Sequence, residues 1–289
     1  MTPVQRVDAP TKSHGVVPVG PVRSRFRVAA ADRGKWWRFA VILVATAVTL
    51  APLLSIVLPT LGRGRGAQGG LPFGVDTLVG VLAYTPALTW LGNSLAVTMS
   101  TVLVAVLVAA PAGYAISRAR GRLVSTYSLT LFVLQSVPTI LFLIPLFVLF
   151  ARFGLVDNLV GLTIIYIGIT VSVAVWMLTA YFSSIPISLE EAAWLDGCSV
   201  FGGFVRIVLR NSGPGIASTA IFTFMAAWND YLIAVVFVHS ESQLTLGIGL
   251  QMARSPALIL IIVLPPLVIF GLLNRYFSVG GIAGALSER

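Results

Sequence analysis

Side chains that could carry out chemistry are few in this sequence, and none belongs to a catalytic pattern. The single cysteine, Cys198, can form no disulfide within the chain and no cysteine-based metal site. The two histidines, His14 and His239, are far apart, and their spacing indicates no pair of metal ligands. No paired carboxylates accompany them. We therefore expect no catalytic residue and no metal site, and the pattern disfavours a soluble enzyme.

A nucleotide-binding loop is also missing from the sequence. Such a loop needs the pattern G-x-x-x-x-G-K-[ST], whose backbone amides and lysine hold the phosphates. The only Gly-Lys pair is Gly34-Lys35, but Trp36 follows it and Ala29 stands at the position of the first glycine. The glycine-rich stretch 62–70 contains no lysine. We therefore expect that the chain does not bind ATP itself.

Asp230 is the one ionisable residue within a long apolar run. A carboxylate in the middle of a membrane-spanning helix costs about 2.5–3.5 kcal/mol, which favours a position facing other helices or water. The neighbouring Trp228, Asn229 and Tyr231 could stack on a polar ligand and form hydrogen bonds with it. These four residues either line a translocation path or make structural contacts between helices.

Gln135 and Thr139 form a second polar pair within an apolar run. They flank Pro138, which frees a backbone carbonyl and can kink a helix. A polar lining of the same path is one interpretation of this pair, and helix packing is the other.

Long apolar runs must position these residues. Hydrophobic residues make up 57% of the chain and charged residues only 10%, whereas soluble domains carry roughly 25% charged residues. Because a helix needs about 20 apolar residues to cross a bilayer, the runs predict an all-α membrane protein with about six transmembrane helices. The expected spans are 39–62, 90–116, 123–151, 160–182, 213–238 and 255–274, and Gly80 and Pro86 predict a loop before the second span.

The distribution of Lys and Arg predicts the orientation. Most of these residues lie in the tail 1–38, in the turn 118–122 and around Arg206 and Arg210, all of which fall on one side of six spans. The positive-inside rule places that side, with both termini, in the cytoplasm of a multi-pass cell-membrane protein. Basic residues form no stripe interleaved with aromatic residues, so nucleic-acid binding is excluded. We expect the tail 1–38 to be disordered against anionic lipid and 39–289 to be the transmembrane domain.

The segment 183–212, between the fourth and fifth spans, is too structured for a simple polar loop. Ser188 and Glu191 fit a capping box at the start of a short helix. Gly197 stands where that helix must stop, and glycine tolerates the left-handed conformation of such a stop. A second helix over about 201–209 would place Phe204, Ile207 and Val208 on one face. These features predict two helices and a sharp turn outside the membrane, either as a docking surface or as a compact loop.

The same segment resembles the EAA loop of ABC importer permeases. The resemblance rests on Glu191, Ala192 and Ala193, on Gly197 after three intervening residues, and on the IVL triplet 207–209 after nine more. Further similarity covers NSL at 93–95, GLVDNLVGL at 154–162, YFSSIP at 181–186, AWNDYL at 227–232 and RYFSVGGIAGAL at 275–286. Together these motifs are similar to the second permease subunit of carbohydrate importers, the maltose-type group.

The resemblance implies a type I ABC importer permease fold and alternating access driven by a separate ATPase. Glu191, Ala192, Ala193, Asp196 and Gly197 would couple the chain to that ATPase. The implied partners are a second homologous permease subunit, two ATPase subunits, an extracytoplasmic substrate-binding protein and the lipid bilayer. ATP and Mg²⁺ would bind the ATPase subunits, so this chain would hold no cofactor and would be no enzyme.

Several features leave the cargo open. Arg210 stands where the family usually has proline, and the stretch between the last two spans is short. An importer of glycerol phosphate or another polar solute is therefore an alternative to a sugar importer. An ion-coupled secondary carrier or a channel is a further alternative, although such proteins usually place several ionisable groups in the middle of the membrane.

Overall fold

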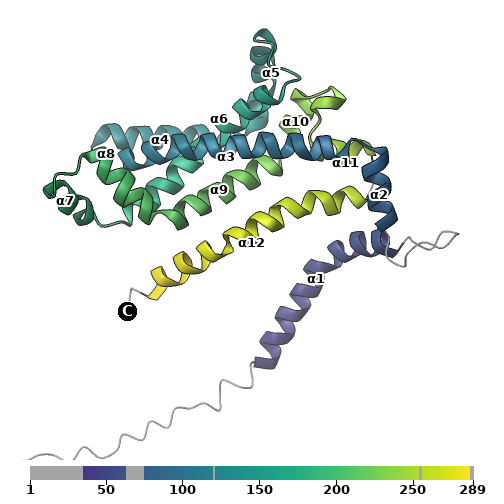
Figure 1. Ribbon diagram of the computed structural model, residues 1–289, viewed down its shortest axis with the longest axis horizontal. Helices are drawn as coiled ribbons and strands as arrows, with labels where there is room; N and C mark the ends of the chain where they lie inside the picture. The colour runs from purple at the N-terminus through teal and green to yellow at the C-terminus, as the bar shows by residue number, and fades with distance from the viewer. Residues whose placement is uncertain (1–34, 63–74, 120, 254–255, 287–289) are drawn as a thin grey trace, which may run out of the picture. The chain divides into compact units, whose positions relative to one another are not determined.

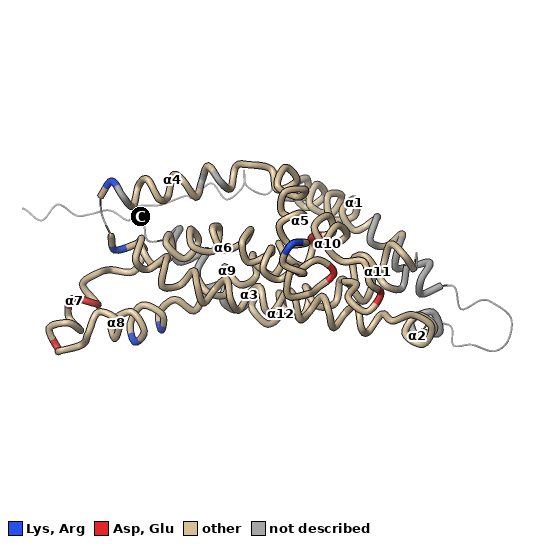
Figure 2. The backbone as a smooth tube through the Cα atoms, turned by 90° about the horizontal axis from the view of Figure 1, so that it is seen from above, with Lys and Arg blue, Asp and Glu red and all other residues tan. Residues whose placement is uncertain are grey.

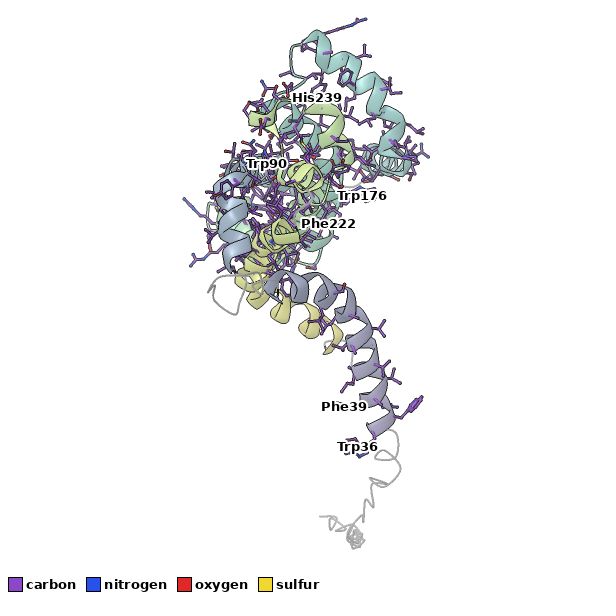
Figure 3. All side chains as sticks on the ribbon, turned by 90° about the vertical axis from the view of Figure 1, so that its right-hand side faces the viewer. Trp36, Phe39, Trp90, Trp176, Phe222 and His239 are labelled. Atoms are coloured by element: carbon purple, nitrogen blue, oxygen red, sulfur yellow. The ribbon has the colours of Figure 1, made fainter. Side chains whose placement is uncertain are left out.

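The computed structural model describes residues 35–62, 75–119, 121–253 and 256–286. It divides into two units, Met1–Ser55 and Ile56–Arg289, which are described separately. In the first unit, the described residues belong to the apolar helix α1 (Lys35–Gly62), which begins with exposed aromatic side chains such as Trp36 and Phe39 (Figure 3). Residues 1–34 of the predicted tail lie outside the described residues, so their expected disorder stays a prediction.

Two described helices of the second unit are long and apolar enough to cross a bilayer. They are α3 (Ala87–Arg118) and α6 (Leu159–Ser183), which cover the predicted spans 90–116 and 160–182. The two helices pack along each other (Figure 1). A Cβ at Gly113 of α3 would lie 3.1 Å from the backbone nitrogen of Thr179 in α6, so glycine permits the close approach.

The other helices of this unit surround or extend that pair. Helix α9 packs on both α3 and α6, and α12 packs on α9 (Figure 1). Their bounds are α2 Val75–Tyr84, α4 Arg122–Ser136, η2 Thr139–Phe142, α5 Leu143–Arg152, α7 Ser188–Leu195, α8 Val200–Gly203, η3 Phe204–Leu209, α9 Gly213–Trp228, α10 Leu232–Phe237, η4 Glu241–Gln243, α11 Leu246–Ala253 and α12 Pro256–Leu286.

Charged residues of the described part of the second unit gather at its two ends. Figure 2 shows them near α7, α8 and one end of α4, and near α5, α10 and α11 at the opposite end, with uncharged helix between. We call these the α7 end and the α10 end. Each end has its own buried cluster, around Phe182, Phe204 and Val208 at the α7 end and around Phe150 and Phe237 at the α10 end. An uncharged stretch between two charged ends suits a protein whose middle lies in lipid.

Two predicted spans are not continuous helices. The prediction of one helix over 123–151 was wrong, because α4 ends at Ser136 and a 3₁₀ turn precedes α5. Pro138 causes this break, since it has no N–H to donate and disfavours helical backbone at Val137. The prediction of one helix over 213–238 was also wrong, because the helix stops at Trp228 and restarts at Leu232.

Two further predictions of element bounds were wrong. The loop predicted before the second span contains helix α2, which ends shortly before Pro86. The last span, predicted as 255–274, belongs to a helix that continues to Leu286. A charge such as Arg275 ends an apolar run but does not stop a helix, because Arg is a good helix former.

Candidate functional site

Helix α7 starts one residue earlier than the sequence pattern predicted. The residue before its first turn is Ile187, whose backbone is already helical and whose side chain makes no capping bond. The backbone N–H of Glu191 donates to the carbonyl of Ile187 over 3.0 Å. The predicted capping box of Ser188 and Glu191 was therefore wrong, because Ser188 lies inside the first turn and cannot take the extended conformation of a capping residue.

The end of α7 matches the prediction for Gly197. This residue has a φ of +84°, in the left-handed region. Its N–H donates to the carbonyl of Trp194 over 3.0 Å, and the N–H of Cys198 donates to the carbonyl of Ala193 over 2.9 Å. These two bonds form a Schellman motif, which requires a left-handed residue at its centre. The sharp turn between the two helices is thus built by Gly197.

The second helix of this segment is less regular than predicted. Ser199 caps α8 by accepting from the N–H of Gly202 over 3.1 Å. The chain then continues as a π-helical segment, η3, instead of a regular α-helix. Phe204 and Val208 are buried and Ile207 is half-buried, which confirms the predicted inward face. We call Ser188–Leu209 the α7–η3 element.

Glu190 fastens α7 to helix α3. Its side chain is fully buried, and it is the one buried residue of α7. Arg118 donates to Oε1 of Glu190 from Nη2 over 2.6 Å and from Nε over 2.8 Å. The hydroxyl of Tyr114 donates to Oε2 over 2.6 Å. The sequence analysis did not identify this cluster. One signal was available: two adjacent glutamates on a helix point about 100° apart, so they have different surroundings and one of them can face the bundle.

Glu191 and the tip of the α7–η3 element face outward. Glu191, Ala192, Asp196 and Gly197 are exposed, and Ala193 is half-buried. Around the turn, Leu195 is 90% exposed, Phe201 74% and Val200 60%. The tip therefore presents apolar side chains beside acidic ones, which is the composition of a surface that another protein covers.

Asp230 lies at the α10 end, in the break of the fifth span, two residues before α10 begins. Its Oδ2 accepts from the N–H groups of Ile233 and Ala234 over 3.0 and 3.3 Å. The hydroxyl of Tyr166, in α6, donates to the same oxygen over 2.8 Å. The carboxylate therefore satisfies orphan amides at the start of α10 and ties that helix to α6.

Two cavities contain the other predicted path residues. A cavity of about 140 Å³ is lined by Asp230, Tyr166, Thr170 and Thr139 among apolar residues. Thr139 also lines a second cavity of about 410 Å³, together with Gln135. Gln135, Thr139 and Asp230 thus line two adjoining cavities, and Thr139 lines both of them.

The remaining aromatic and polar candidates are spread over different surroundings. Trp228 is buried, stacks on Phe224 with ring centroids 5.3 Å apart and donates from Nε1 to the carbonyl of Ile262 over 3.1 Å. Asn229 and Tyr231 are exposed. The four consecutive residues therefore do not form one continuous lining, and only Asp230 among them reaches the 140 Å³ cavity.

Asp157 holds the loop after α10 in place. This residue has a left-handed backbone, with φ of +56°, and its N–H donates to the carbonyl of Phe237 over 2.7 Å. Its carboxylate accepts from the N–H groups of His239 and Ser240 and from the Ser240 hydroxyl. These hydrogen bonds hold the pKa of Asp157 below its ordinary value, the Ser240 hydroxyl contributing most. His239 therefore lies at the rim of the α10 end (Figure 3).

Asn93 and Ser94, near the start of α3, bind the segment 242–246 by hydrogen bonds. The side-chain amide of Asn93 donates to the carbonyls of Ser242 and Leu244, both over 2.9 Å. The hydroxyl of Ser94 accepts from the N–H of Leu246 over 2.8 Å. Helix α3 is thus tied to α7 near one end and to the chain before α11 near the other.

Comparison with known proteins places this architecture in a family. The family described as "Binding-protein-dependent transport system inner membrane component" matches residues 102–279. The chain is 32% identical over 254 residues to the maltodextrin transport system permease protein MdxG of Bacillus subtilis, covering 82% of this chain and 90% of that protein. It is also 32% identical over 210 residues to the inner membrane ABC transporter permease protein YcjP of Escherichia coli K12, covering 70% of this chain and 75% of that protein.

A solved structure supports the same fold. A crystal structure of a bacterial ABC transporter involved in the import of the acidic polysaccharide alginate contains a similar chain, with a TM-score of 0.70 at 21% identity. The match covers 89% of this chain and all of that one. Because the family match extends over more than half of the sequence, the chain belongs to the binding-protein-dependent transport system inner membrane components, the permease subunits of ABC importers.

Proposed function

We propose that this permease subunit forms half of the translocation path of an ATP-driven sugar or oligosaccharide importer and is driven through the α7–η3 element. Its partners are a second homologous permease subunit, two ATPase subunits that bind ATP and Mg²⁺, and an extracytoplasmic substrate-binding protein. The chain itself supplies no catalytic residue and no cofactor. Alternating access would follow from movements that the ATPase subunits impose on the α7–η3 element, whose contacts must differ between the two states.

The exposed tip of the α7–η3 element carries this proposal. Leu195 and Phe201 project from a capped turn and are 90% and 74% exposed, beside the exposed carboxylate of Glu191. Burying large apolar side chains stabilises an interface by about 25 cal/mol per Å². A short helix that ends in a fixed turn can enter a cleft without losing conformational entropy. An ATPase subunit with an apolar cleft and a basic rim fits this surface.

The charge distribution supports a cytoplasmic position for the same surface. Arg118 binds Glu190 of α7, Arg122 begins α4 four residues later, and Arg206 and Arg210 lie in η3 and directly after it. Arg152 ends α5, which lies at the α10 end (Figure 2). Cytoplasmic loops of membrane proteins carry the excess of Lys and Arg. We infer that the α7 end and both termini lie in the cytoplasm, and that the α10 end meets the binding protein.

A carbohydrate cargo is supported by the relatives and by the chemistry of the cavities. One such relative is the maltodextrin transport system permease protein MdxG, and another is the arabinooligosaccharides transport system permease protein AraQ of Halalkalibacterium halodurans. The 140 Å³ cavity combines apolar walls with the hydroxyl groups of Thr139 and Tyr166 and the carboxylate of Asp230. Hydroxyl and carboxylate groups on an apolar wall suit a ligand that has both C–H faces and many hydroxyl groups.

Recovery of the ATPase with a tagged chain tests the docking proposal. Glu191→Arg reverses the charge at the tip, and we expect it to lower the amount of ATPase subunit recovered in mild detergent about tenfold, the effect of like charges meeting at an interface. Glu241→Arg is the matched control, because Glu241 is equally exposed but lies at the α10 end. Equal recovery with both variants would contradict docking through this tip.

The cargo is tested on the cognate substrate-binding protein. We expect maltotriose or another oligosaccharide to raise the Tm of that protein, because a ligand that binds only the folded state stabilises it. Glycerol 3-phosphate serves as the competing ligand. A Tm that rises with glycerol 3-phosphate and not with any oligosaccharide would end the carbohydrate proposal and favour a polar-solute importer.

A further inference from the structure

Glu190 is the buried attachment of α7 to the membrane helices. It is the only buried residue among the eight residues of α7. Leu189 and Leu195 are 48% and 90% exposed, and the half-buried Trp194 lies against Gly203 of α8, within the same α7–η3 element. Helix α7 is therefore a lever whose one fully buried side chain, Glu190, binds α3.

That carboxylate binds α3 with a fixed geometry. Both nitrogens that Arg118 directs at Glu190 reach Oε1, and the Tyr114 hydroxyl reaches Oε2. Nη2 of Arg118 also donates to the carbonyl of Ile185 over 3.2 Å, which ties the same arginine to the chain just before α7. Charge-assisted hydrogen bonds of this kind are short and directional, so they fix orientation as well as distance.

Aromatic packing extends the same connection to η3. The ring of Tyr114 lies 4.6 Å from the ring of Phe204, and the Arg118 guanidinium lies 5.9 Å from the centre of the Tyr114 ring. Phe204 also packs edge to face on Phe182 near the end of α6. Tyr114 therefore touches both halves of the α7–η3 element, by its hydroxyl and by its ring.

Helix α3 reaches from this cluster to the opposite end of the bundle. It has 32 residues, about 48 Å at 1.5 Å per residue. Near its other end, Asn93 and Ser94 bind the segment 242–246 by three hydrogen bonds. A displacement of α7 that is transmitted to Arg118 and Tyr114 can therefore reach the α10 end along one continuous helix, which contains Pro111 between the two attachment points.

We propose that Glu190, Arg118 and Tyr114 are positioning residues that form the mechanical joint between the α7–η3 element and α3. Movement of the ATPase reaches the membrane helices through this joint, and the effect of the substrate-binding protein at the α10 end reaches the ATPase through it. The proposal rests on the proposed function, because it assigns a role within the ATPase-driven cycle. A buried ion pair contributes little net stability compared with apolar residues of similar volume. In this proposal the charged pair serves the joint through the directionality of its hydrogen bonds.

The test uses the assembled transporter and the stimulation of ATP hydrolysis by the substrate-binding protein. The double variant Arg118→Met with Glu190→Leu replaces the pair by apolar side chains, so we expect the complex to assemble, with a Tm lowered only by the loss of the acceptor of the Tyr114 hydroxyl. Its stimulation should fall about five- to tenfold, the size of a typical coupling between two sites. The swapped variant Arg118→Glu with Glu190→Arg should restore part of the stimulation, and Arg122→Met, exposed on the neighbouring α4, should leave it unchanged.

A second variant covers the case in which the double variant does not assemble. Tyr114→Phe keeps the ring contact with Phe204 and removes only the hydrogen bond to Glu190, so it should assemble and lower the stimulation about twofold or more. Wild-type stimulation in an assembled double variant or in Tyr114→Phe would overturn this inference alone. A wild-type chain that recovers no ATPase subunit would overturn the proposed function and this inference with it.

Discussion

Glu190 and Glu191 are consecutive residues of α7, yet their carboxylates have opposite surroundings. The Glu190 side chain is fully buried against Arg118, whereas Glu191 is exposed. A helix turns about 100° per residue, so one carboxylate faces the bundle and the other faces away from it. The pair thus divides two tasks between neighbouring positions, attachment to α3 and presentation of a free charge to a partner.

The left-handed turn at Gly197 predicts a specific cost of adding a side chain. A Cβ at this position would meet no atom within 4 Å, so the cost of Gly197→Ala comes only from the backbone φ of +84°. We expect a loss of about 1–2 kcal/mol, seen as a lower Tm of the detergent-solubilised protein and a lower recovery of the ATPase.

Gly168→Ala is the matched control for that variant. Gly168 lies within α6 and also has open space around its Cβ position. Alanine favours a helix over glycine by about 0.5–1 kcal/mol, so this variant should keep or raise the Tm. Equal Tm values for the two variants would show that the turn does not require a left-handed residue.

The hydrogen bonds of Asp157 predict a pH-dependent contribution to stability. Because the Ser240 hydroxyl and the amides of Ser240 and His239 lower the pKa of this carboxyl, its contribution is complete above the unfolded pKa of about 4 and is lost as the pH falls through the folded pKa. Asp157→Asn removes the charge and keeps an acceptor, and Asn tolerates the left-handed backbone.

The measurement compares the Tm of wild type and of Asp157→Asn between pH 3 and pH 7. We expect wild type to have the higher Tm at pH 7 and the difference to shrink as the pH falls below about 4. Asp196→Asn serves as control, since Asp196 is exposed and caps no loop. A difference in Tm between wild type and Asp157→Asn that stays constant from pH 3 to pH 7 would contradict a stabilising contribution from the ionised Asp157 carboxylate.

Asp230 is expected to act first as the cap of α10. Asp230→Ala leaves the amides of Ile233 and Ala234 and the Tyr166 hydroxyl without their acceptor, at a cost of about 1–3 kcal/mol. Asp230→Asn retains an accepting oxygen and should recover most of the loss in Tm. Uptake measured in parallel separates this role from path lining, because an assembled Asp230→Asn transporter with reduced uptake would assign the carboxylate to the path. Equal Tm values for Asp230→Ala and wild type would exclude the capping role.

Much of the helical architecture could be predicted from apolar runs and charges. The runs 90–116 and 160–182 were located within a few residues, because a membrane span must be long, apolar and uncharged. The turn at Gly197 was also predicted, since a helix that ends on glycine has a local cause. Features that follow from a few neighbouring residues are readable in the sequence.

The interruption of the fifth span and the burial of Glu190 depend on contacts between residues that are far apart in the sequence. The fifth span is interrupted because Tyr166, 64 residues before Asp230, helps to hold the carboxylate at a helix start. Glu190 is buried because Arg118, 72 residues before it, lies opposite. In the sequence, Arg118 counts only as a charge at the end of a span. Pairing over such distances becomes visible only when α7 is placed against α3 and the start of α10 against α6.

Cross-linking from the tip of the α7–η3 element tests the central claim most directly. In a Cys198→Ser background, this chain would carry one cysteine, either Leu195→Cys at the exposed tip or Ser240→Cys at the exposed α10 end, and the complex would be treated with a thiol-to-amine cross-linker. We predict that Leu195→Cys links to the ATPase subunit and that Ser240→Cys does not. An ATPase that links to Ser240→Cys, or that is present in the complex but never links to Leu195→Cys, would contradict the account.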